Sequence, residues 1–101
     1  KDPAAVTTAE AAMANAPGNA LVTDTLGWIL FQNGQTDRAL QLLRDARLVL
    51  RGNPDIHYHL AVVLAKSGRK TEAKDELDAA IKSGVEFESL SAAKALVSTL
   101  K

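Results

Sequence analysis

A chain of 101 residues is long enough for one small domain with a core of its own. It contains no cysteine, which excludes disulfides and thiolate metal sites, and its twelve basic and twelve acidic residues leave no net charge. Neither half is a polybasic nucleic-acid or anionic-membrane surface. No apolar run approaches the roughly 20 residues of a membrane-spanning helix, so we expect no direct membrane insertion.

Helical spacing of apolar residues predicts six helices, of which the first three cover about 3–15, 20–33 and 36–50. Asp2-Pro3 supplies a capping residue and a proline at the first helical position. Asn33-Gly34 separates the second and third helices. Asn-Gly is typical of a β-hairpin turn, but the flanking period is helical. We therefore interpret Gly34 as a left-handed residue that ends a helix.

The C-terminal half repeats this arrangement, with helices expected over about 54–67, 70–83 and 89–100. Asn53-Pro54 caps the first of them, and Gly68 ends it. The last helix keeps Leu90, Ala95 and Val97 in register with the earlier helices but has Lys94 and Ser98 in place of leucines. Such decay is expected of a terminal helix with a solvated outer face.

An internal period of 34 residues is the strongest signal in the chain. It aligns size-matched residues of both helices: Val22 with Ile56, Leu26 with Leu60, Gly27 with Ala61, Ile29 with Val63, Leu30 with Leu64, Gly34 with Gly68, Ala39 with Ala73, Leu43 with Leu77 and Ala46 with Ala80. The same offset, taken backwards, reaches Ala5, Ala9 and Ala12. The first helix is therefore interpreted as the second half of a preceding unit.

These positions resemble the tetratricopeptide repeat (TPR), a 34-residue helix–turn–helix unit with a large and then a small apolar residue at its seventh and eighth positions. Here those are Leu26-Gly27 and Leu60-Ala61. The resemblance implies an all-α fold in which antiparallel helical hairpins form a right-handed superhelical solenoid with a C-terminal capping helix. Residues 1–101 are then a single domain: 1–17 hold the second helix of a preceding repeat, 20–53 and 54–87 are repeats, and 88–101 form the cap.

The sequence departs from the family at two kinds of position. Arg51 and Val85 replace the proline that usually ends a unit, and Thr23 and His57 replace the usual aromatic residue at the fourth position. A narrower resemblance, carried by "DTLGWILFQNGQTDRALQLLRDA", is to the C-terminal repeats of long bacterial TPR proteins that accompany exopolysaccharide and exosortase (PEP-CTERM) protein-sorting systems. It implies the C-terminal part of a longer, exported scaffold protein, which favours a bacterial extracytoplasmic location.

The helix over 20–33 carries apolar side chains on two opposite faces, which an ordinary surface helix does not need. At about 100° per residue, Val22, Leu26, Ile29 and Leu30 share one side. In the family, the other side corresponds to the concave, ligand-facing surface. We therefore predict a groove for a peptide or protein partner, formed by Leu21, Asp24, Trp28, Phe31, Tyr58, His59, Val62 and Lys66. The alternative is that Trp28 and Phe31 pack on the alanine-rich preceding helix.

Other kinds of site have little support. His57 and His59 point about 200° apart on a helix and cannot share a metal ion, and Asp55 with His59 would be a weak pair of ligands. The family's clamp for a C-terminal carboxylate needs lysine and asparagine on the first helix, where this sequence has Asp24, and Asp24 would repel a carboxylate. An extended or helical peptide with apolar anchors is the expected ligand.

The charged helices are interpreted as solvated faces. Glu72, Asp75, Glu76 and Asp78 interleave with lysines, and Arg44, Arg47 and Arg51 lack the interleaved aromatic residues of a nucleic-acid site. No G-x-S-x-G elbow or phosphate-binding glycine loop occurs, so we predict no enzyme and no cofactor.

The leading hypothesis is accordingly a non-catalytic scaffold module. The alternative is a purely structural C-terminal cap of a longer array, whose helical faces pack only against neighbouring repeats or against a second copy of the chain, in a homodimer through an exposed N-terminal repeat face.

Overall fold

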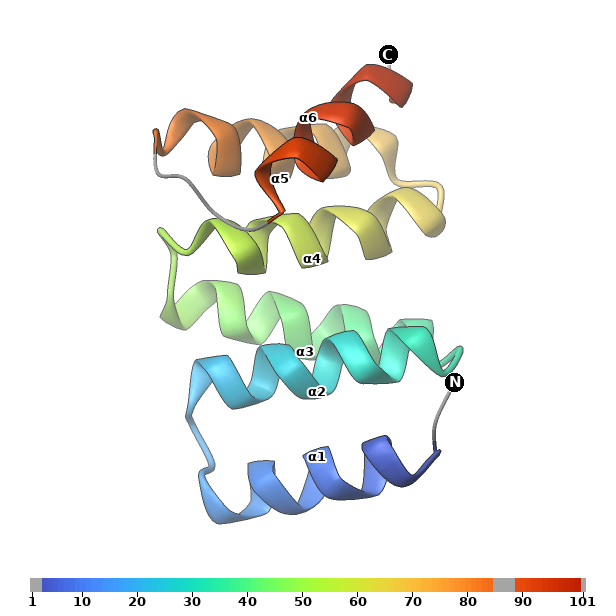
Figure 1. Cartoon of the computed structure of the whole chain (residues 1–101), viewed down its shortest axis with the longest axis vertical. Coiled ribbons are helices and arrows are strands. Elements are labelled where there is room, and N and C mark those ends of the chain that lie inside the picture. Colours follow the sequence, from blue (N-terminus) through green and yellow to red (C-terminus); the bar gives the residue numbers. More distant parts are fainter. Residues whose placement is uncertain (1–2, 85–88, 101) are drawn as a thin grey trace. The chain divides into compact units, whose positions relative to one another are not determined.

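The computed structural model describes residues 3–84 and 89–100, and in those residues it consists of α-helices and turns without a strand (Figure 1). The helices are α1 (Pro3–Asn15), α2 (Ala20–Gln32), α3 (Thr36–Val49), α4 (Pro54–Lys66), α5 (Lys70–Lys82) and α6 (Leu90–Thr99). The all-α class is confirmed, and each predicted helix boundary agrees to within one residue. The expected cap at Asp2 and the departure at Val85 lie outside the described residues.

The chain forms two compact units, Lys1–Leu50 and Arg51–Lys101, which we call the N-terminal and C-terminal units. In the N-terminal unit, α2 packs on both α1 and α3; in the C-terminal unit, α5 packs on both α4 and α6. Consecutive helices α2 and α3 run antiparallel, as do α4 and α5 (Figure 1). No helix in the described part of the chain is long and apolar enough to cross a membrane.

The two glycine turns are built from the same hydrogen bonds, 34 residues apart. Gly34 and Gly68 have φ values of +85° and +80°, in the left-handed region where a Cβ atom is penalised. After Gly34, the amide of Gln35 donates to the carbonyl of Leu30 at 2.9 Å, and after Gly68 the amide of Arg69 donates to Leu64 at 2.9 Å. These bonds satisfy carbonyls that a helix end leaves without a partner. Both glycines end a helix as predicted.

The starts of α2 and α4 are likewise equivalent. The Asn19 side chain accepts from the amides of Leu21 and Val22, at 3.0 and 3.1 Å. One period later, Asn53 accepts from the amide of Ile56 at 3.2 Å and precedes Pro54, the first residue of α4. Asparagine side chains at this position satisfy amides that have no partner within the helix. The predicted Asn53-Pro54 helix start is therefore confirmed.

Each unit has a core made of aligned residues. Leu26, Leu30 and Leu43 are fully buried in the N-terminal unit, and Leu60, Leu64 and Leu77 occupy the same positions in the C-terminal unit, also with no more than 1% of their surface exposed. A Cβ atom on Gly27 would lie 3.0 Å from Cγ of Leu43. The small residue of the repeat thus allows α2 and α3 to approach closely.

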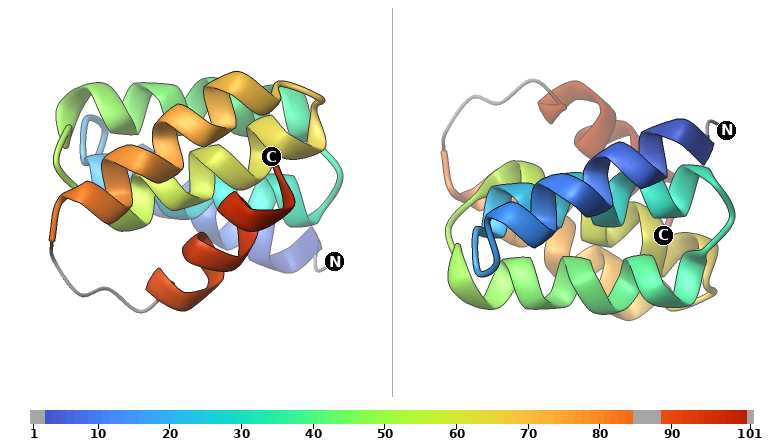
Figure 2. Two further views of the ribbon diagram at one scale, coloured as in Figure 1. Left: turned by 90° about the horizontal axis from the view of Figure 1, so that it is seen from above. Right: turned by 90° about the horizontal axis from the view of Figure 1, so that it is seen from below.

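The last helix departs from the register that the period predicts. Ala93 and Leu100 are buried, while Ala95 is exposed. Figure 1 shows α6 inclined to α4 and α5, and Figure 2 shows the same helix from above and below. The physical reason is polar substitution, because Lys94 and Ser98 stand where leucines are expected. Burying an ammonium group without a partner is costly, and in this orientation both residues are exposed.

Candidate functional site

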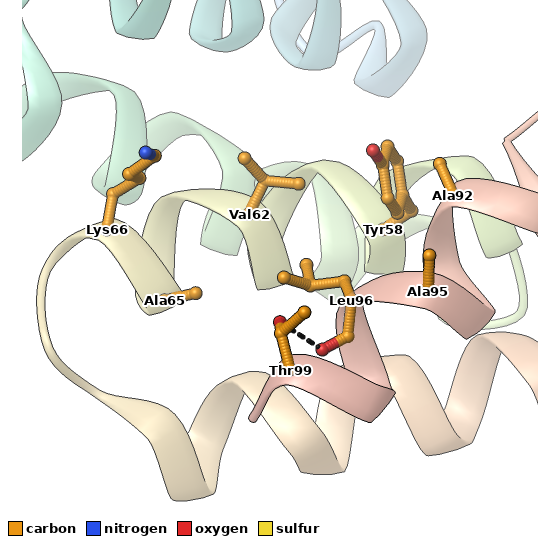
Figure 3. Close-up of a pocket in the computed structure, with 8 residues that line it drawn as sticks. All are labelled: Tyr58, Val62, Ala65, Lys66, Ala92, Ala95, Leu96 and Thr99. Atoms are coloured by element: carbon orange, nitrogen blue, oxygen red, sulfur yellow. Dashed lines mark hydrogen bonds between the residues drawn. The ribbon is translucent and has the colours of Figure 1, made fainter. Parts of the chain in front are cut away.

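The predicted groove residues of α4 border a cleft in the C-terminal unit. Its volume is about 370 Å³, and it lies between α4 and α6; we call it the α4–α6 cleft. Its lining consists of Tyr58, Val62, Ala65 and Lys66 on α4 and Ala92, Ala95, Leu96 and Thr99 on α6. Tyr58, Val62 and Lys66 follow one another along α4 (Figure 3). The structure therefore places three of the predicted residues at one concave surface.

The α6 side of this cleft was not predicted. Leu96 and Thr99 line it from α6, 34 residues after Val62 and Ala65, which line it from α4. The hydroxyl of Thr99 donates to the carbonyl of Leu96 at 2.8 Å (Figure 3), so this polar group is satisfied within its own helix. The 34-residue period was the sequence signal that could have identified these residues of α6.

His59, the remaining predicted residue of α4, does not line the cleft. Its ring lies beside that of Tyr58, with centroids 6.0 Å apart and an interplanar angle of 54°. Both side chains are half-buried. In the structure, His59 is a neighbour of the aromatic residue that borders the cleft rather than part of the cleft lining.

In the N-terminal unit, Leu21 borders a smaller depression. With 56% of its surface exposed, Leu21 is an exposed large apolar residue. It lines a depression of about 190 Å³ between α1 and α2, together with Ala9, Ala12, Val22 and Thr25. We call this feature the α1–α2 hollow. Its lining is apolar except for the hydroxyl of Thr25, which donates to the carbonyl of Leu21 at 2.9 Å.

The aromatic pair of α2 lies partly in the core. The rings of Trp28 and Phe31 have centroids 5.6 Å apart and are tilted by 34°, and both residues are half-buried. Phe31 packs against a buried cluster that includes Ala9 of α1 and Leu30 of α2. Phe31 is therefore partly covered by the core of the N-terminal unit.

Asp24 differs from its expected placement on the groove surface. Only 7% of its surface is exposed. Asp24 follows Ala20 by four residues, which places the two about 40° apart on the helix, and Ala20 is buried too. The buried side of α2 thus includes more residues than the large apolar ones from which it was predicted. Asp24 therefore presents little surface to a ligand.

A family model described as tetratricopeptide repeat matches residues 30–97, which is more than half of the chain. This chain belongs to the tetratricopeptide repeat family. TPR domains generally mediate protein–protein interaction and are generally not catalytic. A comparison with curated proteins finds no match.

The fourth position of the second TPR unit carries a polar link in place of an aromatic side chain. His57 is buried, and its Nδ1 atom lies 2.7 Å from Oε1 of Glu76, while Nε2 lies 2.6 Å from the carbonyl oxygen of Arg51. A carboxylate and a carbonyl can only accept hydrogen bonds, so with Glu76 ionised the ring donates from both nitrogens as an imidazolium. The two contacts of His57 join α4 to α5 and to Arg51, which precedes α4.

This arrangement corrects one interpretation. Glu76 was expected on a solvated face, yet only 9% of its surface is exposed. Glu76 lies three residues after Ala73 and four before Ala80, which is the spacing of the buried side of the TPR helix α5. That spacing was the signal that sequence reasoning missed. In the described residues, no group of three or more histidine, aspartate or glutamate side chains could hold a metal ion.

Proposed function

We propose that the protein is a non-catalytic scaffold module that binds a segment of a partner protein at the groove-facing side of its repeats. The observation that supports this most is the α4–α6 cleft. It has an apolar lining, and three predicted groove residues, Tyr58, Val62 and Lys66, border it. Apolar concave surfaces with few polar groups are where ligands and partner side chains bind most often. The family's general role in protein–protein interaction supports the same reading.

The test is selection of peptides from a random library by the 101-residue chain, followed by binding measurements with variants. We expect selected peptides to bind the wild type and to lose most of their affinity for Tyr58→Ala and Val62→Asp. Thr71→Asp is the matched control, because Thr71 is exposed on α5 and does not line the cleft. Circular dichroism verifies that each variant is folded. Unchanged binding by folded cleft variants would contradict the proposal.

A second candidate function is self-association through the α1–α2 hollow. Ala9 and Ala12 of α1 correspond, one period later, to Leu43 and Ala46 of α3, which have no more than 1% of their surface exposed. In the N-terminal unit, α2 packs on α3. Ala12, by contrast, is exposed and lines the hollow together with Leu21, which is also exposed. This apolar face favours a structural role in which a second copy of the chain covers it.

Light scattering tests the second candidate. A homodimer that forms through the hollow should dissociate in Ala12→Glu and persist in Asn15→Glu, a control at an exposed polar position of the same helix. A wild-type chain that is monomeric at high concentration would exclude this role. The proposed cellular setting, a bacterial exopolysaccharide or protein-sorting system at an extracytoplasmic location, rests on the narrower sequence resemblance alone. Capture of the native partner in such a bacterium would test it.

A further inference from the structure

We infer that the α4–α6 cleft recognises an extended peptide segment in which an aliphatic side chain stands two residues from an aspartate or glutamate. The inference rests on the proposed function and specifies the chemistry of the partner at that site. It follows from three features of the cleft: its apolar walls, the charged side chain of Lys66, and the spacing between Val62 and Lys66 along α4.

The walls of the cleft fit an aliphatic side chain. Val62 and Leu96 face it from α4 and α6, and alanines form much of the remaining lining. Because alanine side chains are short, they leave a volume of about 370 Å³. The hydroxyl of Thr99 already donates to a backbone carbonyl. A ligand carbonyl or carboxylate in contact with Thr99 would therefore lose water without receiving a hydrogen bond from that hydroxyl, whereas an aliphatic group loses no hydrogen bond on leaving water.

The charge at the cleft determines which second side chain of the ligand is favoured. Among the described residues that line the cleft, Lys66 is the only charged one, and it stands at the opposite end from Tyr58 (Figure 3). Its side chain is exposed, and it forms no ion pair with any residue that the structure describes. An ammonium group at the rim of an apolar cleft attracts a carboxylate and disfavours a cationic partner, so it contributes to specificity.

The spacing determines the pattern within the ligand. Val62 and Lys66 are one helical turn apart, which is about 6 Å along α4. In an extended peptide, side chains on the same side recur every second residue, at about 6.6 Å. An aliphatic residue at Val62 therefore places a side chain two residues away beside Lys66.

The test uses a random peptide library selected separately on the wild-type chain, Lys66→Glu and Lys66→Met. We expect peptides selected on the wild type to carry an aliphatic residue with aspartate or glutamate two positions away. Lys66→Glu should select lysine or arginine there and bind the wild-type-selected peptides about five- to tenfold more weakly. Lys66→Met should show no charge preference. Lys70→Glu is the matched control, since Lys70 is exposed outside the cleft, at the start of α5.

The outcomes separate the inference from the proposed function. Peptides that bind the wild type and Lys66→Glu equally well, or that carry no acidic preference, would overturn the inference and leave the proposed function standing. The same result would show that Lys66 serves only the C-terminal end of α4, where a cation is favourable. If no peptide binds the wild type above background, both fail. Thermal melting of each variant verifies that it is folded under the selection conditions.

Discussion

The Nδ1 atom of His57 lies 2.7 Å from Oε1 of Glu76, and both side chains are buried. This bond joins two helices of one hairpin at the position where the family usually has an aromatic residue. We expect Glu76→Ala to lower the free energy of unfolding by about 2–3 kcal/mol, because it leaves a buried imidazole nitrogen without its partner. Glu76→Gln keeps an acceptor oxygen and should cost less, about 1 kcal/mol.

Urea unfolding measures both changes, with Asp75→Ala as the control. Asp75 is the preceding residue of α5 and is exposed, so its removal should change stability by less than about 0.5 kcal/mol. If Glu76→Ala and Asp75→Ala were equally mild, the bond to His57 would contribute nothing measurable to stability.

The glycine turns provide a test within one chain. Gly34→Ala should destabilise the protein by about 1–2 kcal/mol, because Gly34 has a φ of +85° and a Cβ atom is strained there. Gly52→Ala is the matched control: Gly52 is not in the positive-φ region, and a Cβ atom built on it meets nothing within 4 Å. It should be neutral or slightly stabilising. Thermal unfolding of the two variants would show the difference, and equal melting temperatures would contradict it.

The contrast between core and surface leucines gives a third prediction. Leu77→Ala should cost about 2–5 kcal/mol, since Leu77 is fully buried and its truncation leaves a cavity. Leu21→Ala should change stability by less than about 0.5 kcal/mol, because more than half of Leu21 is exposed. Denaturant unfolding checks both. A large loss for Leu21→Ala would mean that the α1–α2 hollow is covered in solution, and light scattering of the wild type would then reveal the covering copy.

The single tryptophan reports on α2 directly. Trp28 is half-buried and its ring lies against Phe31. We expect acrylamide to quench its fluorescence at a rate between those of a free indole and a fully buried one. Phe31→Ala should increase the quenching, because one neighbour of the ring is removed. Complete protection of Trp28 in the wild type would exclude it from any binding surface.

Much of the fold could be predicted because the 34-residue period reflects packing and backbone requirements that recur in each helical hairpin. For successive hairpins to form, equivalent positions must carry side chains of the same size or adopt the same left-handed backbone conformation. Helix ends could therefore be assigned from sequence alone at Gly34, Gly68 and Asn53. The burial of Leu43 and Leu77 follows from the same periodicity. Helix boundaries therefore needed no knowledge of tertiary structure.

The candidate site was less accessible to sequence reasoning, because it depends on contacts between distant residues. Glu76 stands among three exposed acids. Its spacing from Ala73 and Ala80 marks the buried side of α5, but its partner His57 lies 19 residues away and could be identified only from the structure. Tyr58, Val62 and Lys66 could be found by counting helical turns, whereas the existence of a cleft between α4 and α6 could be seen only in the structure.

Because α6 forms part of the cleft, ligand binding changes the local stability of α6. α6 packs on α5 and supplies half of the cleft lining. A ligand seated against Leu96 loses those contacts whenever α6 detaches, so occupancy raises the free energy of that local opening. Amide hydrogens of α6 would then exchange with deuterium more slowly in the complex, and the last ten-residue helix would report how tightly its ligand is held.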